Sequence, residues 1–109
     1  VKQTARLVDL CRQRVCRLIG GEKPEHVVFT LNTTDAMNMA IHGVLRHALR
    51  TSRQPIHVIT SELDHNSALR PLNALIECYG GRVSQTRVPF DPTTGRIDPA
   101  DIERAMRRK

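Results

Sequence analysis

The chain has 109 residues, enough for one small domain, and its composition of 39% hydrophobic and 26% charged residues is typical of a soluble globular protein. This composition argues against disorder, and no apolar run approaches the roughly 20 residues of a membrane span. The net charge of +6 permits binding to nucleic acids or acidic ligands.

Helical and strand patterns alternate along the chain. Helices are expected over residues 1–19, 35–49 and 68–79 and from Pro99 onward, and strands over 26–31, 56–60 and 82–88. This alternation predicts the α/β class, with a parallel or mixed sheet covered by helices.

The three expected strands differ in character. The run Val27-Val28-Phe29 predicts a strand buried on both faces, whereas the polar content of residues 84–87 is typical of a sheet edge. In parallel sheets ligands lie beyond the carboxyl ends of strands, which directs attention to residues 32–35 and 61–67.

The segment NTTDA, residues 32–36, places two hydroxyls at an expected helix start. Thr33 or Thr34 could cap the helix by accepting a backbone N–H. The same N–H groups and hydroxyls could instead bind a phosphate, although the charge of Asp35 opposes an anion there. These residues alone leave both interpretations open.

The segment SELDHNS, residues 61–67, places His65 beyond an expected strand. A metal site with Glu62 and Asp64 lacks the usual helical spacing and a definite third ligand. A histidine near its ordinary pKa could move protons or lie against an aromatic ligand, and it could also be a plain surface residue.

Taken together, the two segments resemble a known family. FTLNTTDAMNMAIHG, HVITSELDHNSALRPL and YGGRVSQTRVPFDPTTGRIDPADIERAM are similar, in register, to the large domain of class V aminotransferase-fold enzymes, with the cysteine desulfurases as the nearest group. The resemblance implies a partial three-layer αβα large domain of a fold type I transferase that depends on pyridoxal 5'-phosphate, with a mostly parallel sheet. Residues 1–109 would be the N-terminal half of that domain.

The resemblance also implies site residues. Thr33 and Thr34 match the pair that binds the cofactor phosphate, and His65 matches the catalytic histidine that stacks on the pyridine ring. Asp64 stands where the family usually has Glu. The lysine that forms the Schiff base, the aspartate facing the pyridine nitrogen and the persulfide cysteine would lie beyond this chain, because none of its three lysines lies in a matching motif.

The implied enzyme converts L-cysteine to L-alanine and transfers sulfur to one of its own cysteines, as a homodimer that could pass sulfur to an acceptor protein. A class V aminotransferase or a selenocysteine or cysteine lyase is the alternative within the fold. The fragment alone is expected to be inactive. Two alternatives lie outside this enzyme fold: a non-catalytic remnant that folds against a partner, and a basic nucleic-acid-binding module. The arginines are scattered along the chain, which favours neither nucleic acid nor membrane as a partner.

Further expectations concern the location of the protein, the extent of the chain, the cysteines and the order of the sheet. The absence of a signal peptide predicts a cytoplasmic protein, and Val1 within a helical pattern suggests part of a longer chain. The three cysteines, Cys11, Cys16 and Cys78, are expected to be core or boundary residues. The family pattern predicts a parallel ladder between residues 56–60 and 82–88, and little or none between 26–31 and 56–60.

Overall fold

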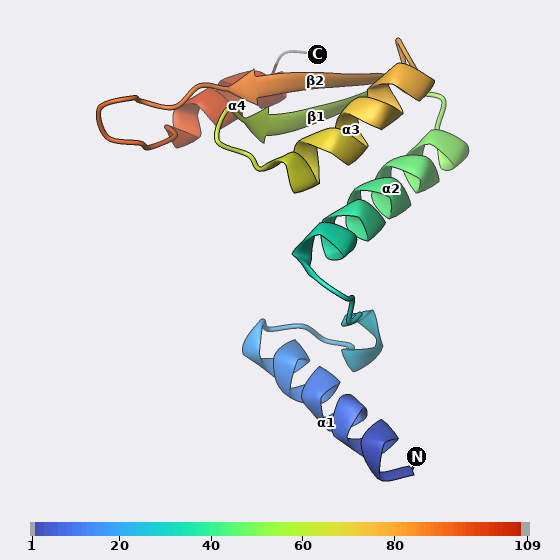
Figure 1. Ribbon diagram of the computed structural model, residues 1–109. Coiled ribbons are helices and arrows are strands. Elements are labelled where there is room, and N and C mark those ends of the chain that lie inside the picture. The colour runs from blue at the N-terminus through green and yellow to red at the C-terminus, as the bar shows by residue number, and fades with distance from the viewer. Residues whose placement is uncertain (1, 108–109) are drawn as a thin grey trace. The chain divides into compact units, whose positions relative to one another are not determined.

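The computed structural model describes residues 2–107, which divide into two compact units (Figure 1). The first unit ends at Leu31 and the second begins at Asn32. Each unit has its own internal packing and is described separately. Among the described residues, no helix is long and apolar enough to cross a membrane.

The first unit consists of helix α1, Lys2–Leu18, and the short 3-10 helix η1, Pro24–His26. The chain leaves α1 through Gly20, whose φ of 69° lies in the left-handed region that glycine adopts without steric cost. Within this unit the Arg12 guanidinium lies 5.8 Å from the centre of the Phe29 ring, where the cation faces the ring electrons.

The strand expected over residues 26–31 is not formed. Its first residue belongs to η1 and the rest has no regular structure, with Val28 60% and Leu31 89% exposed. A strand is held by hydrogen bonds to a neighbouring strand, and none pairs with this segment among the described residues. β-propensity alone therefore did not decide its conformation.

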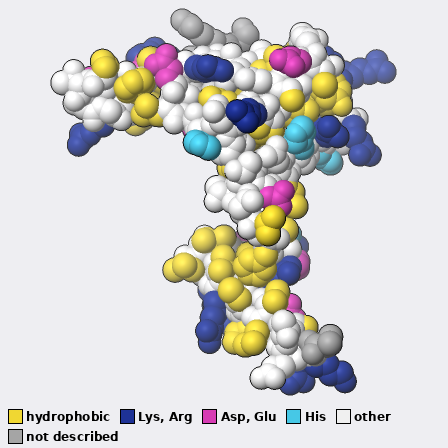
Figure 2. Space-filling view, in the orientation of Figure 1, with side chains coloured by type: hydrophobic (Ala, Val, Ile, Leu, Met, Phe, Trp, Pro, Cys, Tyr) yellow, Lys and Arg dark blue, Asp and Glu magenta, His cyan; other side chains and the backbone are white. Residues whose placement is uncertain are grey.

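Hydrophobic side chains cover much of the face of this first unit that Figure 2 shows. The helix predicted over residues 1–19 forms as α1, but most of its apolar residues are exposed within the described structure. Cys16 is 3% exposed, as expected of a core residue, whereas the same expectation is wrong for the exposed Cys11 and Cys78.

The second unit contains the sheet. Its elements are α2 Thr33–Thr51, β1 Ile56–Ser61, α3 Asn66–Cys78, β2 Val83–Val88 and α4 Pro99–Arg107. β1 and β2 are parallel, with Ile56 opposite Val83 and Ser61 opposite Val88. The predicted ladder is confirmed, as is the absence of pairing between 26–31 and β1 in the described chain.

The sheet has helices on both faces. Ile56, Val58 and Val83 share one face and pack with α2 and α3 through Leu45 and Leu72. The opposite face carries Ile59 and Val88, and α4 lies behind the strands in Figure 1, where its Ile102 borders a small cavity with them. These three layers match the predicted partial αβα domain.

Arg82 ties the start of β2 to the end of α2. Its Nη2 donates to the carbonyl oxygens of Leu49, at 3.2 Å, and Ser52, at 2.6 Å. Carbonyls at a helix C-terminus have no intrahelical donor, and a cation there is also favoured by the helix dipole. The arginine thus fixes the end of α2 against the sheet.

Two helices begin two residues earlier than predicted. α2 begins at Thr33 instead of Asp35, and α3 at Asn66 instead of Ala68. Pro71 consequently lies beyond the first turn of α3, where its missing N–H leaves the Ser67 carbonyl without an intrahelical donor.

The last predicted helix start is confirmed. Asp98 Oδ1 accepts from the Ala100 N–H at 2.9 Å, one residue after Pro99 opens α4. The turn before it is closed by Asp91, whose pKa is lowered first by the hydrogen bond from the Thr93 N–H and then by that from the Thr94 hydroxyl.

Candidate functional site

The start of α2 is capped by Asn32, not by a threonine. Asn32 Oδ1 accepts from the Asp35 N–H at 2.8 Å, and the Asn32 carbonyl accepts from the Ala36 N–H at 3.0 Å. The expectation that Thr33 or Thr34 caps the helix is therefore wrong. Asparagine is at least as good a cap as threonine, and it stands first in the run.

This cap leaves the two threonines available. Thr33 and Thr34 are the first two residues of α2, and both are exposed. Within the described chain neither their N–H groups nor their hydroxyls have a hydrogen-bond partner, while the Thr34 carbonyl accepts from the Asn38 side chain at 2.8 Å. Four donors thus gather at the positive end of a helix dipole, which is the chemistry that a phosphate requires.

The second predicted segment leaves β1 through a tight turn. The Ser61 N–H donates to Asp64 Oδ2 at 2.7 Å, and the Asp64 N–H approaches the Ser61 carbonyl at 3.4 Å. The Glu62 N–H continues the ladder by donating to the Val88 carbonyl at 3.0 Å. Asp64 therefore folds the chain back at the strand end and presents the next residue, His65.

His65 is the cap of α3, a role that the sequence analysis missed. Its Nδ1 accepts from the Ser67 N–H at 3.1 Å, and its carbonyl accepts from the Ala68 and Leu69 N–H groups at 2.9 and 3.2 Å. Histidine is not among the preferred capping residues, so propensity gave no signal for it. The ring remains exposed.

An apolar cavity of about 400 Å³ lies between α2, β1 and α3. Met37 of α2, three and four residues after the threonines and hence on their side of the helix, lines it together with Asp64, the neighbour of His65. Consecutive residues Val58, Ile59 and Thr60 also border it, so it follows the edge of β1 that does not face β2. α2 and α3 lie side by side and begin at the same end of the unit (Figure 1).

Residues close to both predicted segments therefore line one cavity, whereas Thr33, Thr34 and His65 themselves are not among its lining residues. The expectation that both segments follow a strand holds for residues 61–67 and is wrong for residues 32–35, which follow irregular chain. No group of three or more histidine, cysteine, aspartate or glutamate side chains that could hold a metal ion exists among residues 2–107.

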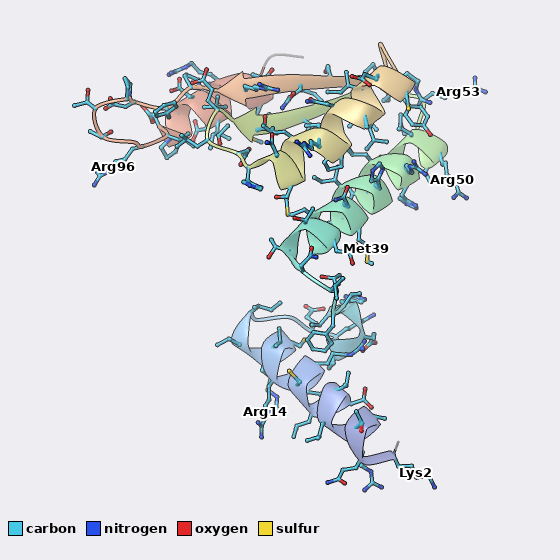
Figure 3. All side chains as sticks on the ribbon, viewed as in Figure 1. Lys2, Arg14, Met39, Arg50, Arg53 and Arg96 are labelled. Carbon is cyan, nitrogen blue, oxygen red and sulfur yellow. The ribbon has the colours of Figure 1, made fainter. Side chains whose placement is uncertain are left out.

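The three arginines of the second unit labelled in Figure 3 lie at two different ends of it. Arg50 and Arg53 extend from the end of α2, whereas Arg96 extends from the loop before α4 at the other end of the unit (Figure 3). A nucleic-acid site usually gathers its positive charges on one face. This arrangement is typical of solvated surface residues.

Comparison with known proteins identifies similar sequences along the whole chain. The profile of the aminotransferase class-V family matches residues 1–109. Selenocysteine lyase of Xenopus laevis is 33% identical over 93% of this chain and 25% of its own length. Cysteine desulfurase IscS of Dictyoglomus turgidum is 33% identical over 98% of this chain and 25% of its own, and that of Pectobacterium carotovorum is 33% identical over 96% and 24%. The chain thus spans about a quarter of the length of these curated relatives.

Proposed function

Because the chain belongs to the class-V aminotransferase family, we propose that it forms the N-terminal half of the cofactor-binding large domain of a cysteine desulfurase-like enzyme. The observation that carries the proposal is the unpartnered donor set of Thr33 and Thr34 at the start of α2, whose Met37 lines the same cavity as Asp64, the neighbour of His65. The relatives' names, cysteine desulfurase and selenocysteine lyase, support this enzyme class.

The cofactor is proposed to be pyridoxal 5'-phosphate. The N–H groups of Thr33 and Thr34 and their hydroxyls would bind its phosphate, and the exposed ring of His65 would lie against its pyridine ring. The Asp35 carboxylate is exposed, so solvent and salt screen its repulsion of a phosphate at the helix start. When bound, the cofactor supplies an electron sink that stabilises a carbanion on an amino-acid substrate.

His65 is proposed as the catalytic residue of this half of the site. A positioned histidine beside the cofactor can hold or move a proton on the substrate, which typically contributes about 10²–10⁴-fold to a rate. Cys11, Cys16 and Cys78 are not assigned the sulfur-accepting role. That cysteine and the cofactor's lysine are proposed to lie in the rest of the enzyme.

The proposed reaction converts L-cysteine to L-alanine and leaves the sulfur on an enzyme cysteine, in a cytoplasmic homodimer that delivers it to an acceptor protein. The second candidate is a selenocysteine lyase, favoured by 33% identity to the Xenopus laevis enzyme, which equals the identity to the Dictyoglomus turgidum desulfurase. Transamination is the third. The two threonines and His65 serve the cofactor in each case.

The cofactor site can be tested on this chain directly. Pyridoxal phosphate, pyridoxal and inorganic phosphate would each be titrated to about 10 mM, ten times a Kd of about 1 mM, while amide and ring NMR signals are followed. We expect phosphate and pyridoxal phosphate to move the Thr33 and Thr34 amide signals, and pyridoxal phosphate alone to move both those amides and the His65 ring. The variant Thr33→Val/Thr34→Val is the control. If no ligand moved either segment, the proposed site would be wrong.

A further inference from the structure

The ring of His65 is held by a single neighbour, Ser67. The Ser67 N–H donates to His65 Nδ1 at 3.1 Å, and the Ser67 Oγ lies 3.1 Å from the same nitrogen. His65 Nε2 has no hydrogen-bond partner in the part of the chain that the structure describes. The two ring nitrogens therefore have different environments.

The chemistry of these donors fixes where the proton of the neutral ring lies. A neutral imidazole has one N–H donor and one acceptor nitrogen, and a backbone N–H can only donate. Nδ1 must then be the acceptor, and the proton must be on Nε2. The Ser67 hydroxyl adapts by rotation and can donate to Nδ1 as well.

Other histidines of the chain lack this constraint. His57 Nε2 lies 2.8 Å from the Thr86 Oγ, but a hydroxyl both donates and accepts, so this contact selects neither tautomer. His26 and His47 are exposed, and neither ring makes a hydrogen bond with the described residues. Their tautomer populations therefore serve as the reference for an unconstrained ring in the same protein.

We propose that Ser67 is a positioning residue that keeps Nδ1 of His65 unprotonated, so that Nε2 is the nitrogen that carries and exchanges protons. Protonation at Nδ1 would remove the cap of α3, whereas exchange at Nε2 leaves the cap intact. The catalytic meaning of this arrangement rests on the proposed function, but the arrangement itself does not. Ser67 would thus determine which edge of the ring faces a substrate proton.

The tautomer can be measured by long-range ¹H–¹⁵N correlation on the chain labelled at its histidine rings, without any cofactor. The measurement is made at alkaline pH, where the neutral form of an imidazole predominates. We expect the Nδ1–H population of His65 to be about fivefold below that of His26 and His47, as a hydrogen bond of about 1 kcal/mol would give. An equal or larger Nδ1–H population would overturn the proposal.

Two variants distinguish the effect of the Ser67 hydroxyl from that of the Ser67 N–H. Ser67→Ala removes the hydroxyl and keeps the N–H, so Nδ1 should stay unprotonated. Ser67→Pro removes both donors at a helical position in the first turn, where proline is tolerated, and should raise the Nδ1–H population of His65 to that of His26. The amide signals of Leu72 and Leu75 report whether α3 remains formed. A folded Ser67→Pro protein in which the Nδ1–H population of His65 is unchanged would contradict the proposal. If that variant unfolds, the comparison of Nδ1–H populations between His65 and His26 or His47 in the wild type decides alone. A failure of pyridoxal phosphate to bind leaves these results unaffected and counts only against the proposed function.

Discussion

Replacing His65 tests its two roles separately, because one belongs to α3 and the other to the proposed chemistry. His65→Ala removes the Nδ1 acceptor from the Ser67 N–H and also removes the ring. His65→Asn removes the ring but keeps an acceptor, since the asparagine Oδ1 and the histidine Nδ1 are both two bonds from Cβ. Asparagine is also among the best capping residues.

The size of the stability change follows from burial and from the cap. His65 is exposed, so its replacement removes little buried apolar surface. The lost cap costs about 1 kcal/mol, within a range of about 0.5–2 kcal/mol. The loss affects global stability because α3 carries Leu72 and Leu75, which are only 2% and 1% exposed in the core.

Urea unfolding of the 109-residue chain measures the first role. We expect His65→Ala to lower the free energy of unfolding by about 1 kcal/mol and His65→Asn to be within about 0.5 kcal/mol of the wild type. Equal losses in the two variants would show that the Nδ1 contact does not act as a cap.

Turnover by the complete enzyme, measured as alanine formed from cysteine with cofactor bound, tests the second role. Both variants should be slower by about 10²-fold or more, although only one is less stable. If His65→Asn kept full activity, proton transfer by the ring would be refuted, whatever the stability results.

Three further predictions concern residues other than His65. Thr33→Val/Thr34→Val should weaken cofactor retention by about 1–3 kcal/mol through loss of the hydroxyl donors while the backbone N–H groups remain, and an unchanged affinity in a cofactor titration would count against a phosphate role. This chain should form no stoichiometric, borohydride-reducible adduct with pyridoxal phosphate at any of its three lysines, and peptide mapping that found one would contradict the proposed location of the cofactor lysine. Arg82→Met should lower the free energy of unfolding by about 1–3 kcal/mol because it removes both bonds to the end of α2, whereas the exposed Arg53→Met should change it by less than about 0.5 kcal/mol in the same urea series.

The sequence predicted the second unit well because its signals are local. The helical periodicity of α2 and α3 and the short apolar run of β1 lie within single elements, and each formed as expected. The pairing of β1 with β2 came from the family resemblance, since neighbouring strands along the chain would otherwise have been paired first.

The strand expected at residues 26–31 failed because a strand is not a local structure. Val28 and Phe29 favour the extended state, but its backbone groups need a neighbour, and the described chain provides none there. Of the two helix caps at the site, only one could have been predicted from the sequence. Asn32 had a recognisable capping signal that the pair of threonines obscured, whereas the cap formed by His65 could not be read from propensities.

The starts of α2 and α3 pair their first backbone N–H groups in different ways, so the two ends of the candidate site differ in the groups they offer to a ligand. At α3, two of the first three N–H groups, those of Ser67 and Ala68, are bonded to His65. At α2, the cap residue Asn32 accepts from the third and fourth N–H groups, those of Asp35 and Ala36, so the first two remain for a ligand. An anion is therefore better stabilised at the start of α2 than at the start of α3, where the exposed group is an imidazole. A ligand with a phosphate at one end and an aromatic ring at the other would consequently bind in one direction, with its phosphate at α2 and its ring toward α3.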